Sequence, residues 1–447
     1  MARGKRADSL RGGNVAWAPT NHSDRLVLSN EVHARPPEAF AAPGRASYIA
    51  VHFDAGERDR ELAHIRGICE QFSLVPPVDG ASHFAARFGD VRIKWERHGE
   101  FSGYTFFLAG KGSAPFAEPA IRRFPADWLE SIPGRTMAAL HVELIECGDS
   151  APDASGMSVH FGGNAVVGGE IGGGAGYAFS DFRIHEDGCA RILMLDRAFT
   201  PGQSGRMLQR LLEIEAYRMM SLLALPMARQ QSAEIRRIEA QLAALTRSIA
   251  KGDGDEVLLG DLTRLAAEVE SALAASLFRF GASRAYFELV TTRIAELRER
   301  RIPGIQTIEE FMAHRLVPAA STCASTSRRL EGLSERVTQA SGLLSTRVGI
   351  ARERQNQALL ASMDRRARIQ LRLQQAVEGL SVAAITYYLV GLVGYAAKAA
   401  KELGIKVDPD LAPGLALPPV LIAVLLLVRS ARRRIVAESA ATRASGG

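Results

Sequence analysis

The hydrophobic pattern changes near residue 200, and the two parts of the chain predict different structures. Between Leu26 and Asp196, apolar residues partly alternate with polar ones and are rich in β-branched and aromatic types. This is typical of strands, which we expect at 46–54, 82–88, 90–98, 104–110, 137–145 and 189–196. Apolar residues at helical spacing predict a helix at 57–72, and the glycine-rich segment 161–182 predicts strands and tight turns.

Beyond Pro201 the apolar spacing becomes helical. Residues 203–300 hold two long helical patterns separated by KGDGD at 251–255, which predicts an antiparallel helical hairpin. The apolar segment LLALPMA is too short to span a bilayer. We therefore expect it to belong to a buried helix that is bent at Pro226.

A further helical region follows IPG at 302–304. Thr307 and Glu310 have the spacing of a capping box and predict a helix start, and Pro318 is expected to interrupt that helix. Residues 319–397 contain no proline, and as one helix they would span roughly 120 Å. A heptad seam early in this region predicts packing against other helices. The seam consists of Leu330, Leu333, Val337, Ala340 and Leu344.

Two uncharged stretches near the C-terminus predict membrane-spanning helices. Residues 379–397 and 411–428 carry no charge, and each stretch is about as long as the hydrocarbon core of a bilayer requires. The alternative is a pair of buried core helices in a soluble domain. The fold class that we predict is an α+β N-terminal domain, a long α-helical hairpin and stalk, and two C-terminal transmembrane helices.

These patterns also set the expected domain boundaries. We expect a flexible N-terminus at 1–24, an α/β domain at 25–200 and a helical hairpin and stalk at 201–378. The first transmembrane helix is expected at 379–397, an external loop at 398–410, the second transmembrane helix at 411–428 and a basic cytoplasmic tail at 429–447.

Arginines flank both uncharged stretches, and the chain has a net charge of +6. By the positive-inside rule, both termini are expected to be cytoplasmic and the protein to cross a bacterial inner membrane twice. Each arginine near an anionic lipid surface contributes about 1 kcal/mol of attraction, so we favour the lipid bilayer over nucleic acid as the partner of these charges. The membrane-surface candidates are Arg365, Arg366, Arg368, Arg372, Arg432, Arg433 and Arg434.

The N-terminus and the cysteines indicate a cytoplasmic location for most of the chain. The first residues are basic but lack an apolar core segment, which argues against a signal peptide. Cys69, Cys147, Cys189 and Cys323 lie far apart without zinc-like spacing, so we interpret them as reduced thiols.

Three polar trios are candidates for ligand or metal binding. Glu96, His98 and Glu100 are two residues apart, so on a strand all three would share one face. Carboxylates and imidazole on one face suit a divalent metal or acid–base chemistry, although a salt-bridged strand face is the commoner meaning of such a pattern.

The other two trios repeat this idea. Glu31, His33 and Arg35 would share a face of an extended segment, and the arginine would suit a carboxylate or phosphate ligand. The alternative is a network that pins the N-terminal segment to its domain. Asp181 and His185 form the third trio together with Arg183. The sequence does not indicate whether the three trios converge.

Known reaction motifs are absent from the sequence. The glycine-rich run has neither the GK[ST] of a phosphate loop nor the dinucleotide-binding fingerprint, and GxSxG and HExxH do not occur. The sequence therefore names no catalytic residue and no cofactor. Within the first uncharged stretch, Tyr387, Tyr388 and Tyr395 are candidates to line a pore or a helix contact, or to lie near the membrane interface.

The chain resembles a bacterial family of membrane-anchored proteins, the domain of unknown function 3422 family. The resemblance rests on NEVHARP (30–36), WERHGEF (95–101), SDFRIHEDG (180–188), residues 210–229, RFGASRAYFELV (279–290) and residues 355–388. It implies a C-terminal membrane anchor and supplies no reaction. The order of parts also resembles CorA-type magnesium channels, but the glycine-methionine-asparagine signature of that family is absent after the first stretch.

Three functions remain open from the sequence. The first is a structural or interaction protein, held at the inner membrane, that binds a protein or a small ligand. The second is an oligomeric CorA-like channel or transporter whose first spans line a pore. The third is a membrane-tethered enzyme that uses the polar trios. The long stalk predicts a homo-oligomer under either of the first two hypotheses.

Overall fold

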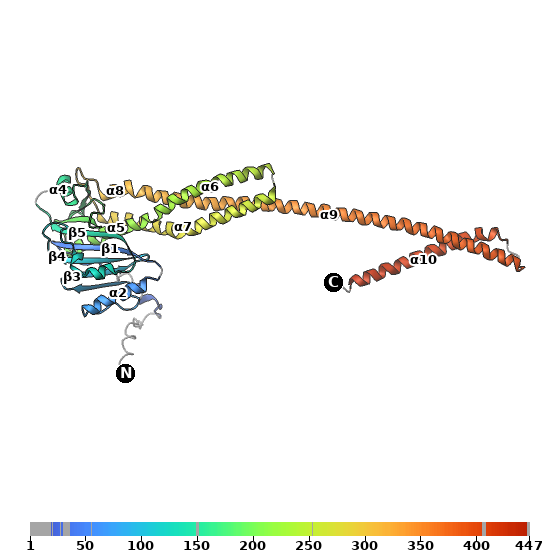
Figure 1. Cartoon of the computed structure of the whole chain (residues 1–447), viewed down its shortest axis with the longest axis horizontal. Coiled ribbons are helices and arrows are strands. Elements are labelled where there is room, and N and C mark those ends of the chain that lie inside the picture. Colours follow the sequence, from blue (N-terminus) through green and yellow to red (C-terminus); the bar gives the residue numbers. More distant parts are fainter. Residues whose placement is uncertain are drawn as a thin grey trace, which may run out of the picture. The chain divides into compact units, whose positions relative to one another are not determined.

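The computed structural model describes residues 19, 21–26, 28–29, 36–54, 56–148, 152–252, 254–404 and 408–444, with side chains up to Ser430. The chain forms two compact units, Met1–Ser341 and Gly342–Gly447. The first unit contains an α+β domain and long helices, and the second contains the two apolar C-terminal helices (Figure 1). The predicted fold class is therefore confirmed in its architecture.

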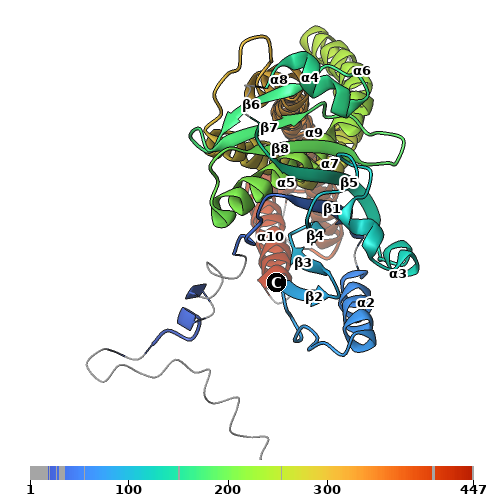
Figure 2. The same cartoon turned by 90° about the vertical axis from the view of Figure 1, so that its left-hand side faces the viewer.

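An eight-stranded sheet forms the centre of the first unit, with the order β2-β3-β4-β1-β5-β8-β7-β6 (Figure 2). All neighbouring strands are antiparallel except β5 and β8, which are parallel. Every strand predicted from alternation is present within a few residues of its expected position. The strands are β1 (Gly44–His52), β2 (His83–Phe88), β3 (Val91–Arg97), β4 (Phe101–Ala109), β5 (Arg135–Glu146), β6 (Val167–Ile171), β7 (Gly176–Ser180) and β8 (Ala190–Asp196).

One face of the sheet is covered by long helices. Side chains of α5 (Pro201–Leu222), α7 (Asp255–Leu297) and α8 (Ile308–Arg315) share one apolar core with alternate residues of β1, β5 and β8. On β5 these residues are Ala138, Leu140, Val142 and Leu144, and the residues between them point to the opposite face.

Shorter helices cover the opposite face in two separate clusters. The first cluster packs α2 (Arg58–Gln71), η2 (Ala120–Arg123) and α3 (Ala126–Glu130) against β1, β3 and β4. The second packs η3 (Val159–Phe161), which follows α4 (Ala154–Ser158), against β7 and β8. The middle of this face, between the two clusters, carries polar residues of β1 and β5.

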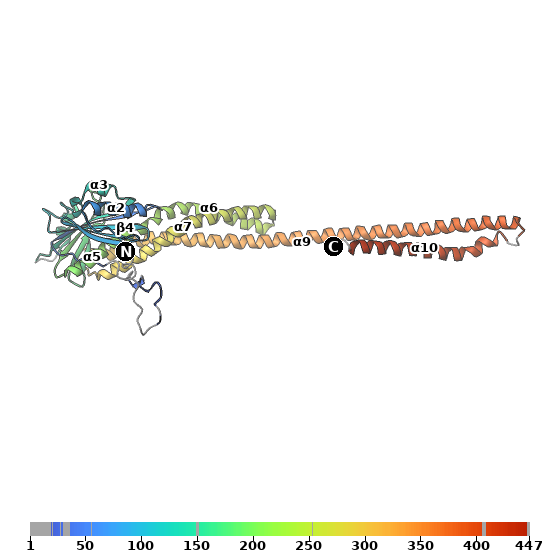
Figure 3. The same cartoon turned by 90° about the horizontal axis from the view of Figure 1, so that it is seen from below.

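The predicted helical hairpin is present, with an additional break. Helix α6 (Ala224–Lys251) is capped by Gly252, which has the positive φ of a left-handed C-cap. Helix α7 then runs back against α6 (Figure 3). The break between α5 and α6 falls at Leu223 rather than at Pro226. Pro226 instead lies in the first turn of α6, where its missing N–H leaves no hydrogen bond unmade.

The capping box at Thr307 is also confirmed. Its hydroxyl accepts a hydrogen bond from the Glu310 backbone N–H at 3.1 Å, and the Glu310 carboxylate accepts one from the Thr307 N–H at 3.1 Å. Helix α8 then ends at Arg315, and α9 continues as one helix from Val317 to Glu402. The helix that begins at Thr307 is therefore interrupted as expected, at Leu316, and Pro318 lies in the first turn of α9.

The N-terminal part of α9, as far as Val337, packs against the hairpin. The seam residues Leu330, Leu333 and Val337 are buried. Arg329 of α9 forms a two-pronged ion pair with Glu239 of α6, with nitrogen–oxygen distances of 2.7 and 3.3 Å. The predicted packing of the seam against other helices is therefore confirmed for this part of α9.

The second unit has the opposite distribution of apolar side chains. By length and composition, two helices can cross a membrane, one within residues 308–402 and one at Leu411–Ser430. Only 11% of the most apolar window of the first and 6% of that of the second are buried. Helix α10 (Leu411–Ala444) contacts α9 where Pro413 meets Gly394, at which an added Cβ would lie 3.2 Å from the proline ring.

Candidate functional site

The three predicted trios have different outcomes. Residues Glu31, His33 and Arg35 lie outside the described residues, so their common face stays a prediction. The prediction that Glu96, His98 and Glu100 share a strand face is wrong. Strand β3 ends at residue 97 and β4 begins at 101, so the last two of these residues belong to the turn between the strands.

The two carboxylates of this trio form ion pairs. Glu96 accepts from the Lys94 ammonium at 2.9 Å. Glu100 binds the guanidinium of Arg279 on α7 with both oxygens, at 2.9 and 3.0 Å. Such a two-pronged pair is among the stronger side-chain contacts. It ties the β3–β4 turn to α7.

The third trio does form a cluster. The Asp181 carboxylate is buried, and its Oδ2 lies 3.1 Å from the His185 ring and accepts from the Asn164 amide at 2.8 Å. Its Oδ1 accepts from the Arg183 backbone N–H at 3.2 Å. Arg183 therefore joins the trio through its backbone, and its side chain is free to face elsewhere.

A cavity of about 680 Å³ opens beside Asp181. Its wall includes the stacked rings of Phe182 and Phe311, whose centroids lie 5.0 Å apart. Of its cationic side chains, Arg218 is already paired with Glu215. Among the described residues, no acidic side chain pairs with the others, which are Arg183, His314 and Arg315. An excess of positive charge beside an apolar wall suits a small organic anion.

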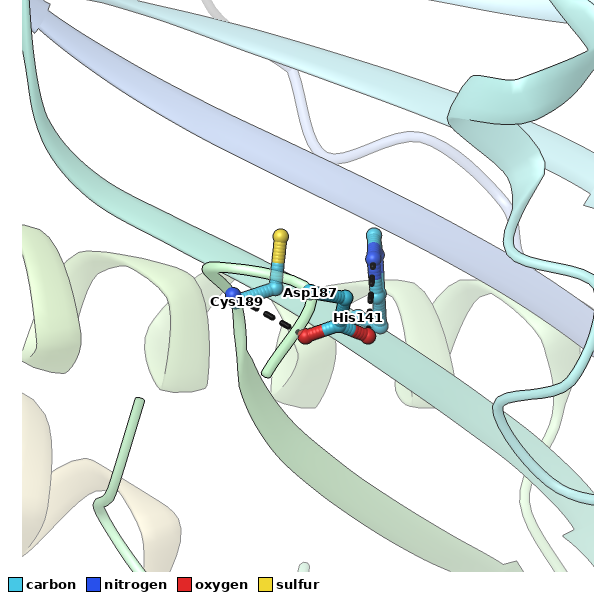
Figure 4. A group of neighbouring side chains, drawn as sticks. All are labelled: His141, Asp187 and Cys189. Atoms are coloured by element: carbon cyan, nitrogen blue, oxygen red, sulfur yellow. Dashed lines mark hydrogen bonds and ion pairs between the residues drawn. The ribbon is translucent and has the colours of Figure 1, made fainter. Parts of the chain in front are cut away.

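The structure brings together one further group that the sequence did not indicate. The His141 nitrogen, an Asp187 carboxylate oxygen and the Cys189 sulfur all lie within 4.8 Å of one another (Figure 4). His141 is on β5, and the other two residues are in the loop that leads from β7 into β8. Because β5 and β8 are parallel neighbours with His141 opposite Arg191, this loop passes beside the histidine.

His141 belongs to the polar strip between the two apolar clusters. Its register partner on β1 is Ser47, whose hydroxyl lies 3.0 Å from Nδ1 of the ring. Two residues along, Glu143 faces Arg45 and accepts a hydrogen bond from the Phe116 backbone N–H at 3.0 Å. Buried polar groups in the strip are thus hydrogen-bonded, as their burial requires.

Burial shifts the pKa values of His141, Glu143 and the neighbouring Cys189. It lowers the pKa of His141 to about 4, so the ring is neutral near pH 7. It raises the pKa of Cys189 to about 11, with a further contribution from Asp187, so the sulfur is a thiol at that pH. Burial also raises the pKa of Glu143 to about 7. Each of these groups is shifted towards its neutral form.

The comparisons with known proteins bear on the whole chain. The sequence model of a family described as "Protein of unknown function (DUF3422)" matches residues 20–435. The chain belongs to the DUF3422 family. No curated protein and no solved structure matches this DUF3422 protein. The family match confirms the resemblance to the DUF3422 family, and nothing supports the analogy to CorA-type channels.

The remaining candidates lie on the long C-terminal helices. On α9, the arginines and tyrosines are exposed, and these are Arg365, Arg366, Arg368, Arg372, Tyr387, Tyr388 and Tyr395. Arg432, Arg433 and Arg434 are in α10, in a part where side chains are not described. The four cysteines form no disulfide, in agreement with the expected thiols.

Proposed function

We propose that this DUF3422 protein is anchored in the bacterial inner membrane by its two C-terminal helices and acts there as a structural or interaction module. The observation that carries the proposal is the outward orientation of apolar side chains in both helices. Leu380, Leu392 and Leu415 are all mostly exposed, although each lies in an uncharged stretch. A bilayer would cover these side chains.

The free energy of the exposed apolar surface differs between water and lipid. Apolar surface left in water forgoes about 25 cal/mol per Å² of burial, and large exposed apolar patches are rare on soluble monomers. A helix satisfies its own backbone hydrogen bonds, so it can cross the hydrocarbon core. Both uncharged stretches are helical throughout their described residues. The same surface that is unfavourable in water is favourable in lipid.

The flanking charge supports the proposed topology. The exposed arginines of α9 precede the first stretch, and a basic segment follows the second. Both termini and the folded body would then be cytoplasmic, with residues 398–410 outside. The exposed tyrosines of the first stretch would contact lipid or a second copy of the chain. We propose that the homo-oligomer forms through such contacts between copies.

The body supplies the interaction part of the proposal. The cavity beside Asp181 has two unpaired arginines and an aromatic wall, so a small anionic ligand suits it. This would make the protein a ligand-binding module at the membrane surface. No observation on the described residues favours a pore.

The anchor can be tested with two matched leucines of α9. Leu392 is 62% exposed in the uncharged stretch, and Leu359 is 61% exposed in the arginine-rich part of the same helix. An arginine in the middle of a spanning helix costs about 2.5–3.5 kcal/mol. We expect Leu392→Arg to lower the carbonate-resistant membrane fraction several-fold, whereas Leu359→Arg should leave it unchanged.

The measurement is alkaline carbonate extraction of membranes from expressing cells, followed by immunodetection of the full chain. Recovery of the unaltered protein in the carbonate supernatant would show that it is not an integral membrane protein. Equal loss of membrane association in both variants would show that general damage to α9, and not insertion, is responsible.

A further inference from the structure

We propose that His141, Asp187 and Cys189 form a zinc site with three protein ligands. The proposal is independent of membrane anchoring, because it rests on the α+β domain alone. Its starting observation is that one nitrogen, one oxygen and one sulfur donor from two distant segments lie within 4.8 Å of one another (Figure 4).

The donor set selects the class of metal. Imidazole and thiolate are ligands of zinc and of the softer transition metals, whereas Mg²⁺ and Ca²⁺ prefer oxygen throughout. Zn²⁺ binds His nitrogen at about 2.0–2.1 Å, carboxylate oxygen at about 2.0–2.2 Å and Cys sulfur at about 2.3 Å. Three protein ligands leave a fourth tetrahedral position for water or an exogenous ligand.

The histidine is already oriented for this role. Its Nδ1 lies 3.0 Å from the hydroxyl of Ser47, which is fully buried and also accepts a hydrogen bond from the Ile121 N–H at 3.2 Å. With Nδ1 held, Nε2 faces Asp187, whose Oδ2 lies 3.9 Å away. Metal-binding histidines are held in this way, with the second nitrogen donating to a neighbouring oxygen.

The three donors lie somewhat farther apart than zinc ligands do, and the loop that carries Asp187 and Cys189 would have to close this gap. Tetrahedral zinc ligands lie ~3.3–3.7 Å apart at these bond lengths, so the donors must approach by about 1 Å. His141 is held in the centre of the sheet. Asp187 and Cys189 precede β8, so a shift of this loop closes the site without breaking the pairing between strands. On binding, the Cys189 thiol would release one proton to solvent and become the thiolate ligand.

One cation competes with the metal. Arg191 lies 3.7 Å from Asp187 Oδ2, and its guanidinium also rests on the Phe116 ring, 5.3 Å from the centroid. The other oxygen, Oδ1, accepts from the Cys189 backbone N–H at 3.1 Å. Zinc must therefore share Oδ2 of Asp187 with Arg191 or displace the arginine from it. Removing this arginine should tighten zinc binding, whereas a purely structural role of the cluster predicts no effect on zinc.

The experiment uses the full-length protein in detergent after treatment with a chelator. Zn²⁺ is titrated against a chromophoric competitor, and Co²⁺ replaces it for absorption spectroscopy. We expect one zinc per chain and a cobalt–thiolate charge-transfer band. Cys189→Ser should abolish the band and weaken zinc binding at least tenfold. Arg191→Met should strengthen zinc binding. Cys147→Ser removes a thiol outside the group and should change neither.

Two outcomes would overturn the site. The first is zinc uptake that is equal in the unaltered protein and in Cys189→Ser. The second is cobalt binding without a thiolate band. Because Cys189→Ser changes one atom in a loop, tryptophan fluorescence of Trp95 and Trp128 should show that its domain is folded. Asp187→Asn keeps the shape of the loop and provides a second, independent loss of a ligand.

Discussion

The leucines of the α+β domain and those of the C-terminal helices face opposite ways. Leu193 on β8 is fully buried in the apolar cluster that also contains Phe161 and Phe179. Leu392 on α9 is mostly exposed, although it has the same side chain and also lies in regular secondary structure. A folded domain in water buries its leucines because the transfer is favourable. The contrast teaches that the two regions are built for different solvents.

Polar groups follow the same division. In the α+β domain, the buried Glu61 carboxylate accepts from Trp95 Nε1 at 2.7 Å and from the Tyr104 hydroxyl at 2.8 Å. The uncharged stretches avoid this requirement, because they contain no ionisable group other than tyrosine. The stability of the domain therefore requires hydrogen-bond partners for its buried polar atoms. The C-terminal helices instead contain few polar side chains.

The largest expected difference comes from one substitution made in each region. Leu193→Ala leaves a cavity in a close-packed core and should lower the free energy of unfolding by about 2–5 kcal/mol. Leu392→Ala removes no protein contact of comparable burial, so it should change this value by less than about 0.5 kcal/mol. Chemical denaturation in detergent, followed by fluorescence, checks both. Equal losses would mean that Leu392 is packed against protein as closely as Leu193 is.

Two tyrosines, one from each region, test the contrast in polar groups. Tyr104→Phe removes a hydrogen bond to a buried carboxylate and should cost about 1.5–3 kcal/mol. Tyr388→Phe removes a hydroxyl from a side chain that is 71% exposed, and we expect a change within about 0.5 kcal/mol. The same denaturation measurement applies. A negligible effect of Tyr104→Phe would indicate that Glu61 is satisfied by its other donors alone.

The smallest effect is expected for ion pairs between helices. Glu239→Gln breaks the two-pronged pair with Arg329, whose side chains are partly exposed, and should cost about 0.2–1 kcal/mol. The loss should shrink further in high salt, because screening weakens the pair in the unaltered protein. Asp364→Asn, which breaks the more exposed pair with Arg368, serves as the reference. A loss well above 1 kcal/mol would show that the Glu239 pair has a larger role in docking α9.

Much of the fold was predictable because its signals are local. Strand alternation, the KGDGD turn and the Thr307 capping box each depend on neighbours within a few residues. The errors occurred where local signals compete. Glu96, His98 and Glu100 fit an alternating pattern, yet Gly99 between them marks the turn that ends β3. The bend expected at Pro226 falls at Leu223 instead, and the proline lies in the first turn of α6.

The candidate metal group could not have been predicted in the same way. A signal existed in AALHVELI, where His141 and Glu143 occupy alternate positions of an otherwise apolar strand. That pattern indicates a polar strip on one face of a buried sheet, but not its partners. The sequence did not connect Cys189 with a metal because His141 lies on a distant strand, β5. Only the parallel pairing of β5 with β8 places the loop beside the histidine.

The sequence by itself determined the order of the strands and helices along the chain, the two uncharged stretches and the charges beside them. These follow from composition and short-range periodicity, which are properties of the chain before it folds. The tertiary structure alone decided the sheet order, which carboxylates form ion pairs and which donors meet at His141. These depend on contacts between residues far apart in the sequence, where packing and register select one arrangement among many that the same local pattern allows.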